Sequence, residues 1–216
     1  MLTEWFKAMM IFVRKGYQTI TMDVNGKKFS EKSIYGYYMF FFTLSLLCVI
    51  TLPKGFDVTF VDYIKDIFSI FIGFFVTALT VIYDKLNITK IPSQEEKDNM
   101  SADKRPSSKD IIRVKQEHNY VIRFFYSIGF NILYASLTLL LLIPFLFWNS
   151  FFSMDLSEYR FVVPSDLSRE TIFVGGHVVF IFIYRLLVIF LIVKVFFYTV
   201  YMITSLVQVL ISKKKI

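Results

Sequence analysis

The sequence predicts an all-α integral membrane protein: a four-helix transmembrane bundle whose long helices extend into the cytosol. Three observations lead to this prediction. Of the 216 residues 56% are hydrophobic, and the mean hydropathy is +0.57, which is too apolar for a soluble domain. Four segments reach the roughly 20 apolar residues that cross a bilayer. The third and fourth belong to helical sequences much longer than a bilayer is thick.

The apolar runs divide the chain into two transmembrane hairpins, residues 34–83 and 121–211. Their four spans are Ile34–Pro53, Phe60–Tyr83, Val121–Trp148 and Ile172–Ile211. The rest of the chain is an amphipathic N-terminal segment (1–33), a basic linker with the start of the third helix (84–120), an external loop (149–171) and a basic tail (212–216).

The positive charges predict the orientation, because Lys and Arg next to spans stay on the cytoplasmic side. Six cations precede the first span, nine run from Lys85 to Arg123 at the start of the third span, and three follow the fourth, against three on the other side. We therefore expect a multi-pass protein of a bacterial inner (cytoplasmic) membrane with both termini in the cytoplasm. The net charge of +7 then reflects topology and contact with anionic membrane lipid, and we expect no direct binding of nucleic acid.

Residues that commonly carry catalysis or bind metals form no recognisable motif. Cys48 is the single cysteine and lies inside the first span, while His118 and His177 lie in different segments. The sequence contains no Gly-rich phosphate loop and no nucleophile elbow. We therefore expect no enzymatic activity, no cofactor and no metal site.

The first 15 residues, "MLTEWFKAMMIFVRK", have the pattern of an amphipathic helix. Two placements are equally consistent with this pattern: on the membrane surface, or packed on the cytosolic ends of the spans. After it, Asn25-Gly26 follows β-rich residues and predicts a short hairpin or turn.

The third and fourth spans belong to two long helices. After a polar linker with a capping-box pair at Ser93 and Glu96, the sequence from Ser108 has no Gly or Pro for 20 residues and passes from charged to apolar. This predicts one helix from Ser108 to about Trp148. The fourth segment is as long, and its residues 195–211 either protrude into the cytosol or bend along the inner leaflet.

A stripe of polar and small residues runs along the second span. Its members recur every three or four positions, which places them on one helical face: Asp62, Asp66, Ser69, Gly73, Thr77, Thr80 and Asp84. Ser69, Gly73 and Thr77 predict a helix-packing face, because small residues let another backbone approach closely in lipid. The third span carries a similar stripe that includes Asn131.

The fourth span contains two cations within the apolar run "IYRLLVIFLIVKVFF". Counted from Ile172, Lys194 is close enough to the inner headgroups for its ammonium to reach them. Arg185 falls near mid-depth, where an unpaired cation costs about 2.5 kcal/mol or more. We therefore expect an intramembrane charge pair between Asp66 and Arg185, helped by Asn131, that serves as a packing staple, a gate or the lining of a polar pathway.

The chain resembles the small four-span membrane subunit of Kiwa, a bacterial antiphage defence system. The similarity covers most of the chain and includes the basic linker "KLNITKIPSQEEKDNMSADKRPSSKD" and the second span "SIFIGFFVTALTVIYDKL". It implies an inner-membrane sensor that forms a homo-oligomer and holds a cytosolic effector subunit.

The functional expectation is a non-enzymatic sensor or scaffold in antiphage defence that recruits a cytosolic protein partner. The docking surface for that partner is expected on the water-exposed start of the third helix, at Lys109, Arg113 and Lys115. The alternative is a pore- or channel-forming membrane effector, in which the layer of Asp66 and Arg185 lines or gates the conduit.

Overall fold

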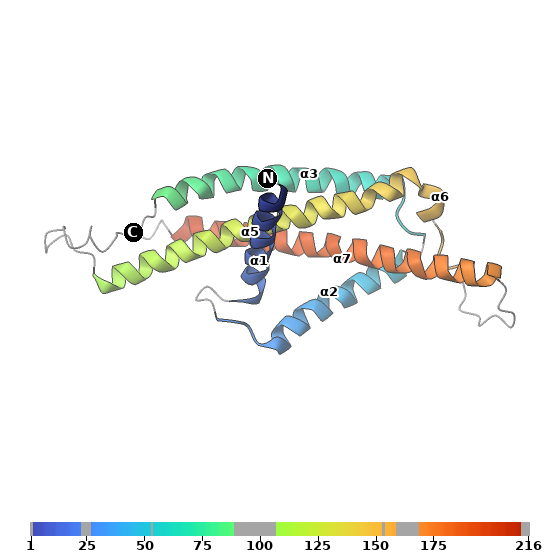
Figure 1. Cartoon of the computed structure of the whole chain (residues 1–216), viewed down its shortest axis with the longest axis horizontal. Helices are drawn as coiled ribbons and strands as arrows, with labels where there is room; N and C mark the ends of the chain where they lie inside the picture. The colour runs from blue at the N-terminus through green and yellow to red at the C-terminus, as the bar shows by residue number, and fades with distance from the viewer. Residues whose placement is uncertain are drawn as a thin grey trace. The chain divides into compact units, whose positions relative to one another are not determined.

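The computed structural model describes residues 2–22, 27–52, 54–88, 107–152, 154–158 and 169–212. In these ranges the chain is helical, with no strand longer than an isolated bridge (Figure 1). The helices are α1 (Leu2–Thr21), α2 (Glu31–Thr51), α3 (Val58–Ile88), α5 (Ser108–Phe147), α6 (Asn149–Phe152) and α7 (Arg169–Ser212).

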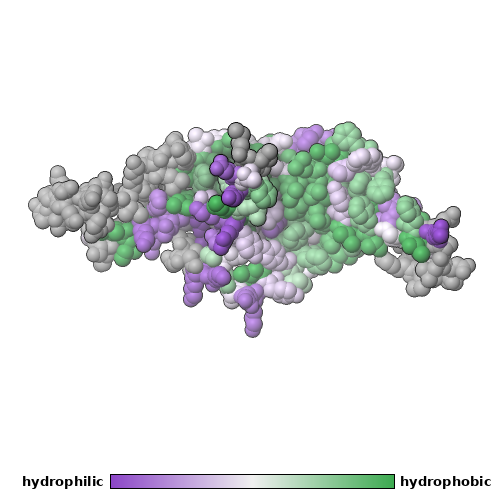
Figure 2. Space-filling model, in the orientation of Figure 1, coloured by the Kyte–Doolittle hydropathy of each residue, from purple (hydrophilic) through white to green (hydrophobic). Residues whose placement is uncertain are grey.

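Four of these helices are long and apolar enough to cross a membrane, namely α2, α3, α5 and α7. The prediction of an all-α, four-span membrane protein is thereby confirmed. One face of the molecule carries a broad hydrophobic surface over the spanning helices (Figure 2). The long third helix is also confirmed, since α5 runs from Ser108 to Phe147 without a break, and α7 continues unbroken to Ser212.

The helices divide into two compact units that cut across α3 and α5. Unit 1 contains residues 1–31 and 73–132, and unit 2 contains residues 32–72 and 133–216. The capping pair Ser93 and Glu96 and the lysines of the C-terminal tail lie outside the described residues.

Unit 2 is built around α7. The ring centroid of Phe196 lies 5.8 Å from that of Phe68 on α3, and Phe197 lies 5.2 Å from Phe41 on α2. The Tyr184 hydroxyl donates to a carbonyl of α5 at 2.9 Å. Because α7 contacts all three other spanning helices of this unit, it carries a long series of buried side chains, among them Ile181, Val188, Ile192 and Val195.

In unit 1, α1 packs on α5 through two reciprocal contacts between a glycine and an aromatic ring. A Cβ atom on Gly16 would stand 2.6 Å from Cγ of Phe130, and a Cβ on Gly129 would collide with the ring of Phe12. Both glycines are therefore needed for the close approach of the helices. Of the two placements left open by the sequence, packing on a span is the one seen within the chain.

The end of α1 is held by Arg123 of α5, whose guanidinium donates to the carbonyls of Thr19 and Met22. A cation at this position satisfies carbonyls that the last helical turn leaves without an intrahelical partner. Beyond it, Met22 and Lys28 form an isolated antiparallel bridge. The predicted Asn25-Gly26 turn lies between these two residues, outside the described ranges.

Candidate functional site: buried cations and an exposed polar face

The structure does not bring Asp66 and Arg185 together, so the expected charge pair is corrected. The Asp66 side chain is 73% exposed and lies 3.9 Å from Lys65 on its own helix, whereas Arg185 is 1% exposed. The physical reason is helix rotation: Val61, Ile64 and Phe68 form the buried face of α3, which turns Asp66 outward.

Arg185 instead bonds to backbone carbonyls at the end of α6. Its guanidinium donates to the carbonyl oxygens of Phe152 and Met154, both at 2.6 Å. Those carbonyls lie where α6 ends and the chain leaves the helix, so they lack intrahelical donors. These two bonds to neutral acceptors help a cation to be buried in an apolar span without a contact to Asp66.

The turn between α2 and α3 closes over the same guanidinium. Gly55 has a φ of 82°, a left-handed conformation that favours glycine, and a Cβ there would collide with the Arg185 guanidinium. Arg185 therefore connects α7 to α6 and to the α2–α3 turn. We call this end of unit 2 the turn end.

The level of Arg185 along α7 also differs from the expectation. The ring of His177 contacts the Phe151 carbonyl at 3.2 Å, so α6 lies beside the third turn of α7 and the first turns of α7 extend past it (Figure 1). Counted along the helix from Ile172, Arg185 was expected near the middle of the membrane. In the structure its guanidinium instead contacts the turn end.

Asp155 lies close to this cation in the short segment after α6. The Ser157 hydroxyl and the Ser157 backbone N–H both donate to its carboxylate, at 2.6 and 2.9 Å, and these bonds lower the pKa of Asp155. The charges of Lys54 and Arg185 lower it further. Asp155 therefore remains ionised at neutral pH and adds a negative charge near the turn end.

Lys194 occupies a cage of aromatic rings rather than reaching the headgroups, which corrects the second expectation about α7. The residue is 2% exposed and its ammonium donates to the Tyr134 hydroxyl at 2.9 Å. The Nζ atom stands 4.3 Å from the centroid of Tyr134 and within 6.0 Å of three more rings, those of Tyr38, Phe190 and Tyr198.

The cage draws rings from three helices, α2, α5 and α7, and it stabilises the ammonium through the negative faces of the rings. Among the described residues, no carboxylate forms an ion pair with Lys194. Burying a cation among neutral groups is costly, and an apolar residue could fill the same position without that cost. Packing alone therefore does not account for a lysine at position 194.

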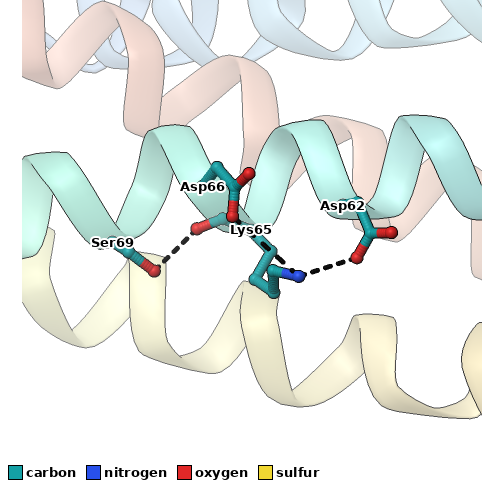
Figure 3. A network of polar contacts seen from close by, with 4 residues as sticks. All are labelled: Asp62, Lys65, Asp66 and Ser69. Atoms are coloured by element: carbon teal, nitrogen blue, oxygen red, sulfur yellow. Dashed lines mark hydrogen bonds and ion pairs between the residues drawn. The ribbon is translucent and has the colours of Figure 1, made fainter.

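The charged part of the polar stripe lies on the exposed side of α3. The Lys65 ammonium donates to Asp62 at 2.7 Å and lies 3.9 Å from Asp66, while the Ser69 hydroxyl donates to the Lys65 carbonyl (Figure 3). The side chains of Lys65, Asp62 and Asp66 are 51%, 51% and 73% exposed. This cluster carries one cation for two carboxylates.

The uncharged members Ser69, Gly73 and Thr77 lie on the same exposed side. The Thr77 hydroxyl donates to the Gly73 carbonyl at 3.0 Å, so the hydroxyls of this stripe are satisfied within α3. A Cβ on Gly73 would meet no atom within 4 Å. Among the residues that the structure describes, the stripe is therefore not a packing face. We call residues Asp62, Asp66, Ser69, Gly73 and Thr77 the polar face of α3.

Asn131 belongs to a different environment from the polar face of α3. It is 1% exposed, and the residues that flank it at helical spacing are also buried: Ser127, Ala135 and Thr138. The stripe on α5 thus packs inside the chain, and the stripe on α3 does not.

The expected docking residues all lie on α5. Lys115 is exposed, and Ile112 beside it is 57% exposed. The side chains of Lys109 and Arg113 are outside what the structure describes.

Two of these features had signals in the sequence. Phe190, Lys194 and Tyr198 are spaced by four on α7, which places two rings of the cage beside the ammonium. A glycine at position 55, in a tight turn, was a signal that another group approaches the backbone there. The acceptors of Arg185 are backbone carbonyls, and these cannot be recognised from the sequence because every residue has one. Within the described ranges, no group of three His, Cys, Asp or Glu side chains converges to hold a metal ion.

No protein-family model matches the chain, and neither the curated protein sequences nor the solved structures gave a match.

Proposed function

We propose that the protein is a membrane-embedded scaffold that assembles with copies of itself through the polar face of α3 and presents a binding surface to a soluble protein partner. The observation that carries this proposal is the exposure of Asp62 and Asp66 on a helix that is apolar enough to span a membrane. Ionisable groups in spans are costly in lipid and usually face a partner or water.

A second copy of the chain fits this face better than lipid does. Ser69, Gly73 and Thr77 form an open row of small residues, which allows two helices in a membrane to approach closely. In a symmetric pair the same face meets itself, so Lys65 of one copy can approach the carboxylates of the other. Ion pairs exchanged in this way would keep the carboxylates of α3 away from the acyl chains.

The sensing role rests on the resemblance to the Kiwa membrane subunit and on the basic charge at the start of α5. The orientation of the chain in the membrane is a separate part of the proposal. Both termini and the 84–120 linker are placed in the cytoplasm, as the 18 to 3 distribution of cations indicates. Cysteine reporters at Ser101 and Lys214 should then be protected from a membrane-impermeant reagent in intact cells, while one at Ser157 should react. Labelling of the Ser101 reporter from outside contradicts this orientation.

Disulfide cross-linking between copies tests the assembly surface. In a Cys48→Ser background, Ser69→Cys should form dimers in native membranes under mild oxidation. Phe74→Cys is the matched control, because Phe74 is 45% exposed but lies roughly 140° around the helix from Ser69. Equal cross-linking at both positions, or none at Ser69→Cys, contradicts assembly through this face.

The exposed carboxylates also favour a second candidate, a pore in which the polar faces of several copies surround water. In that case Asp62 and Asp66 line the conduit and attract cations. Ion flux into proteoliposomes that falls when both residues are replaced by Asn, with cross-linking at Ser69→Cys retained, supports the pore. Absence of flux in wild-type proteoliposomes favours the scaffold.

A further inference from the structure

Helix α1 runs across α5 instead of along it (Figure 1). Their contacts are confined to about two turns of α5, because Phe12 lies 5.6 Å from Tyr126, Gly16 meets Phe130, and Ser127 donates to Thr19 at 2.9 Å. A helix that crosses a membrane-spanning helix lies closer to the membrane plane than to the membrane normal.

The crossing lies where α5 changes from charged to apolar sequence. The candidate span is Val114–Phe147, and Arg123 is its last charged residue. Five charged residues lie in the turns before the crossing: Lys109, Asp110, Arg113, Lys115 and Glu117. The part of α5 that holds α1 is therefore at the boundary between water and hydrocarbon.

One strip of α1 is apolar and left uncovered by the chain. Phe6, Met10 and Tyr17 are 55%, 53% and 44% exposed, and their spacing of four and seven puts them on one side of the helix. Exposed Lys7 and Arg14, seven residues apart, form the adjoining strip.

Beyond this cationic strip the exposed surface of α1 is charged as well, and Ile11 is an apolar residue placed within it. Ile11 is 56% exposed and lies between Lys7, Arg14 and Lys15 around the helix. It has nearly the same exposure as Met10 but points to a different side, which makes these two neighbours a matched pair.

We propose that α1 is an in-plane membrane anchor: Phe6, Met10 and Tyr17 insert at the level of the lipid headgroups and upper acyl chains, while Lys7 and Arg14 contact lipid phosphates. The partner is the lipid surface itself. An apolar strip bordered by cations, on a helix held across a span at the membrane boundary, has the chemistry of interfacial helices. Reciprocal glycine–aromatic packing on α5 and the Arg123 cap would fix the helix at that depth.

Spin-label accessibility in reconstituted vesicles of phosphatidylethanolamine and phosphatidylglycerol tests this anchor. Met10→Cys and Ile11→Cys, each in a Cys48→Ser background, are labelled and compared for collision with oxygen, which concentrates in lipid, and with a water-soluble nickel chelate. The label at Met10 should favour oxygen and the label at Ile11 should favour nickel. Tyr17→Cys and Glu4→Cys form a second pair with the same expected reversal, in case one variant folds poorly, because Glu4 is exposed and lies on the same side of α1 as Ile11.

Two outcomes overturn the proposal. Equal preference for nickel at Met10 and Ile11 means that the strip faces water. Low collision with both reagents at Met10 and Tyr17 means that protein, such as a second copy of the chain, covers the strip instead of lipid. Neither result depends on assembly through α3, so the anchor and the scaffold proposal can fail separately.

Discussion

The Lys194 cage gives a stability prediction whose sign follows from opposing terms. Burying an ammonium costs several kcal/mol even after the protein relaxes. The bond to Tyr134 returns roughly 1.5–3 kcal/mol as a hydrogen bond to a charged group, and desolvated ring contacts return about 2 kcal/mol. Because these terms nearly cancel, Lys194→Met, which keeps an unbranched side chain and removes the charge, should leave stability unchanged or raise it.

Tyr134→Phe should act in the opposite direction, because it keeps the ammonium and removes the hydroxyl that accepts its hydrogen bond. We expect a loss of about 1–3 kcal/mol in the free energy of unfolding. In a Lys194→Met background the same substitution removes no bond to a cation. Its effect there should be smaller by about 1 kcal/mol or more, which a double-mutant cycle measures.

Cys48 provides the assay. It is the single cysteine of the chain, is partly buried and packs against the core of unit 2, so a thiol-reactive fluorogenic dye should report thermal unfolding of purified protein. A change of 1 kcal/mol shifts Tm by about 2–4 °C for a chain of this size. Lys65→Met, at a 51% exposed side chain, is the control for loss of a lysine. A clear drop in Tm for Lys194→Met, or strictly additive effects in the cycle, refutes the cage as the environment of the charge.

Three further predictions concern other contacts. Arg185→Gln should lower Tm because it weakens the hydrogen bonds to the carbonyls of Phe152 and Met154, and each carbonyl left without a donor costs about 1–3 kcal/mol. Asp66→Asn should not change the size of that loss. A strong coupling between the two substitutions would show that Asp66 and Arg185 do form a charge pair. Gly16→Ala should lower Tm because its Cβ would collide with Phe130, whereas Gly36→Ala should not, because a Cβ there meets no atom within 4 Å. Equal shifts in Tm would contradict the close contact between α1 and α5. The third prediction reverses the charge of the expected docking residues, with Glu at Lys109, Arg113 and Lys115. This change should abolish co-purification of a soluble partner while membrane insertion is retained. Unchanged co-purification would mean that the partner docks on another surface.

The helices themselves could be predicted from the sequence because a membrane span is a composition signal. Runs of about 20 apolar residues identify spans whatever their neighbours are, and the four expected spans correspond to α2, α3, α5 and α7. The absence of Gly and Pro after Ser108 likewise predicted that α5 is continuous.

The environments of the intramembrane charges could not be predicted in the same way. Helical spacing correctly placed Asp66, Ser69 and Gly73 on one face, but spacing does not tell which face turns inward, and here the large apolar residues of α3 decide it. Charge matching suggested Asp66 as the partner of Arg185, yet backbone carbonyls are present at every position and can also accept hydrogen bonds from a guanidinium. With 26 Phe and 13 Tyr in the chain, the rings around Lys194 could be identified only from the fold.

Self-assembly through the polar face of α3 is tested most directly by counting copies in particles extracted with the native lipid. Mass photometry should give an oligomer for the wild type and for Phe74→Leu, and mainly monomer for Gly73→Leu. Phe74 is 45% exposed but lies off the polar face. A Cβ at Gly73 would meet no atom within 4 Å and Gly73 is on the exposed side of α3, so a loss of assembly is not expected to come from a clash within the chain. A monomeric wild type, or an intact oligomer of Gly73→Leu, would contradict assembly through this face.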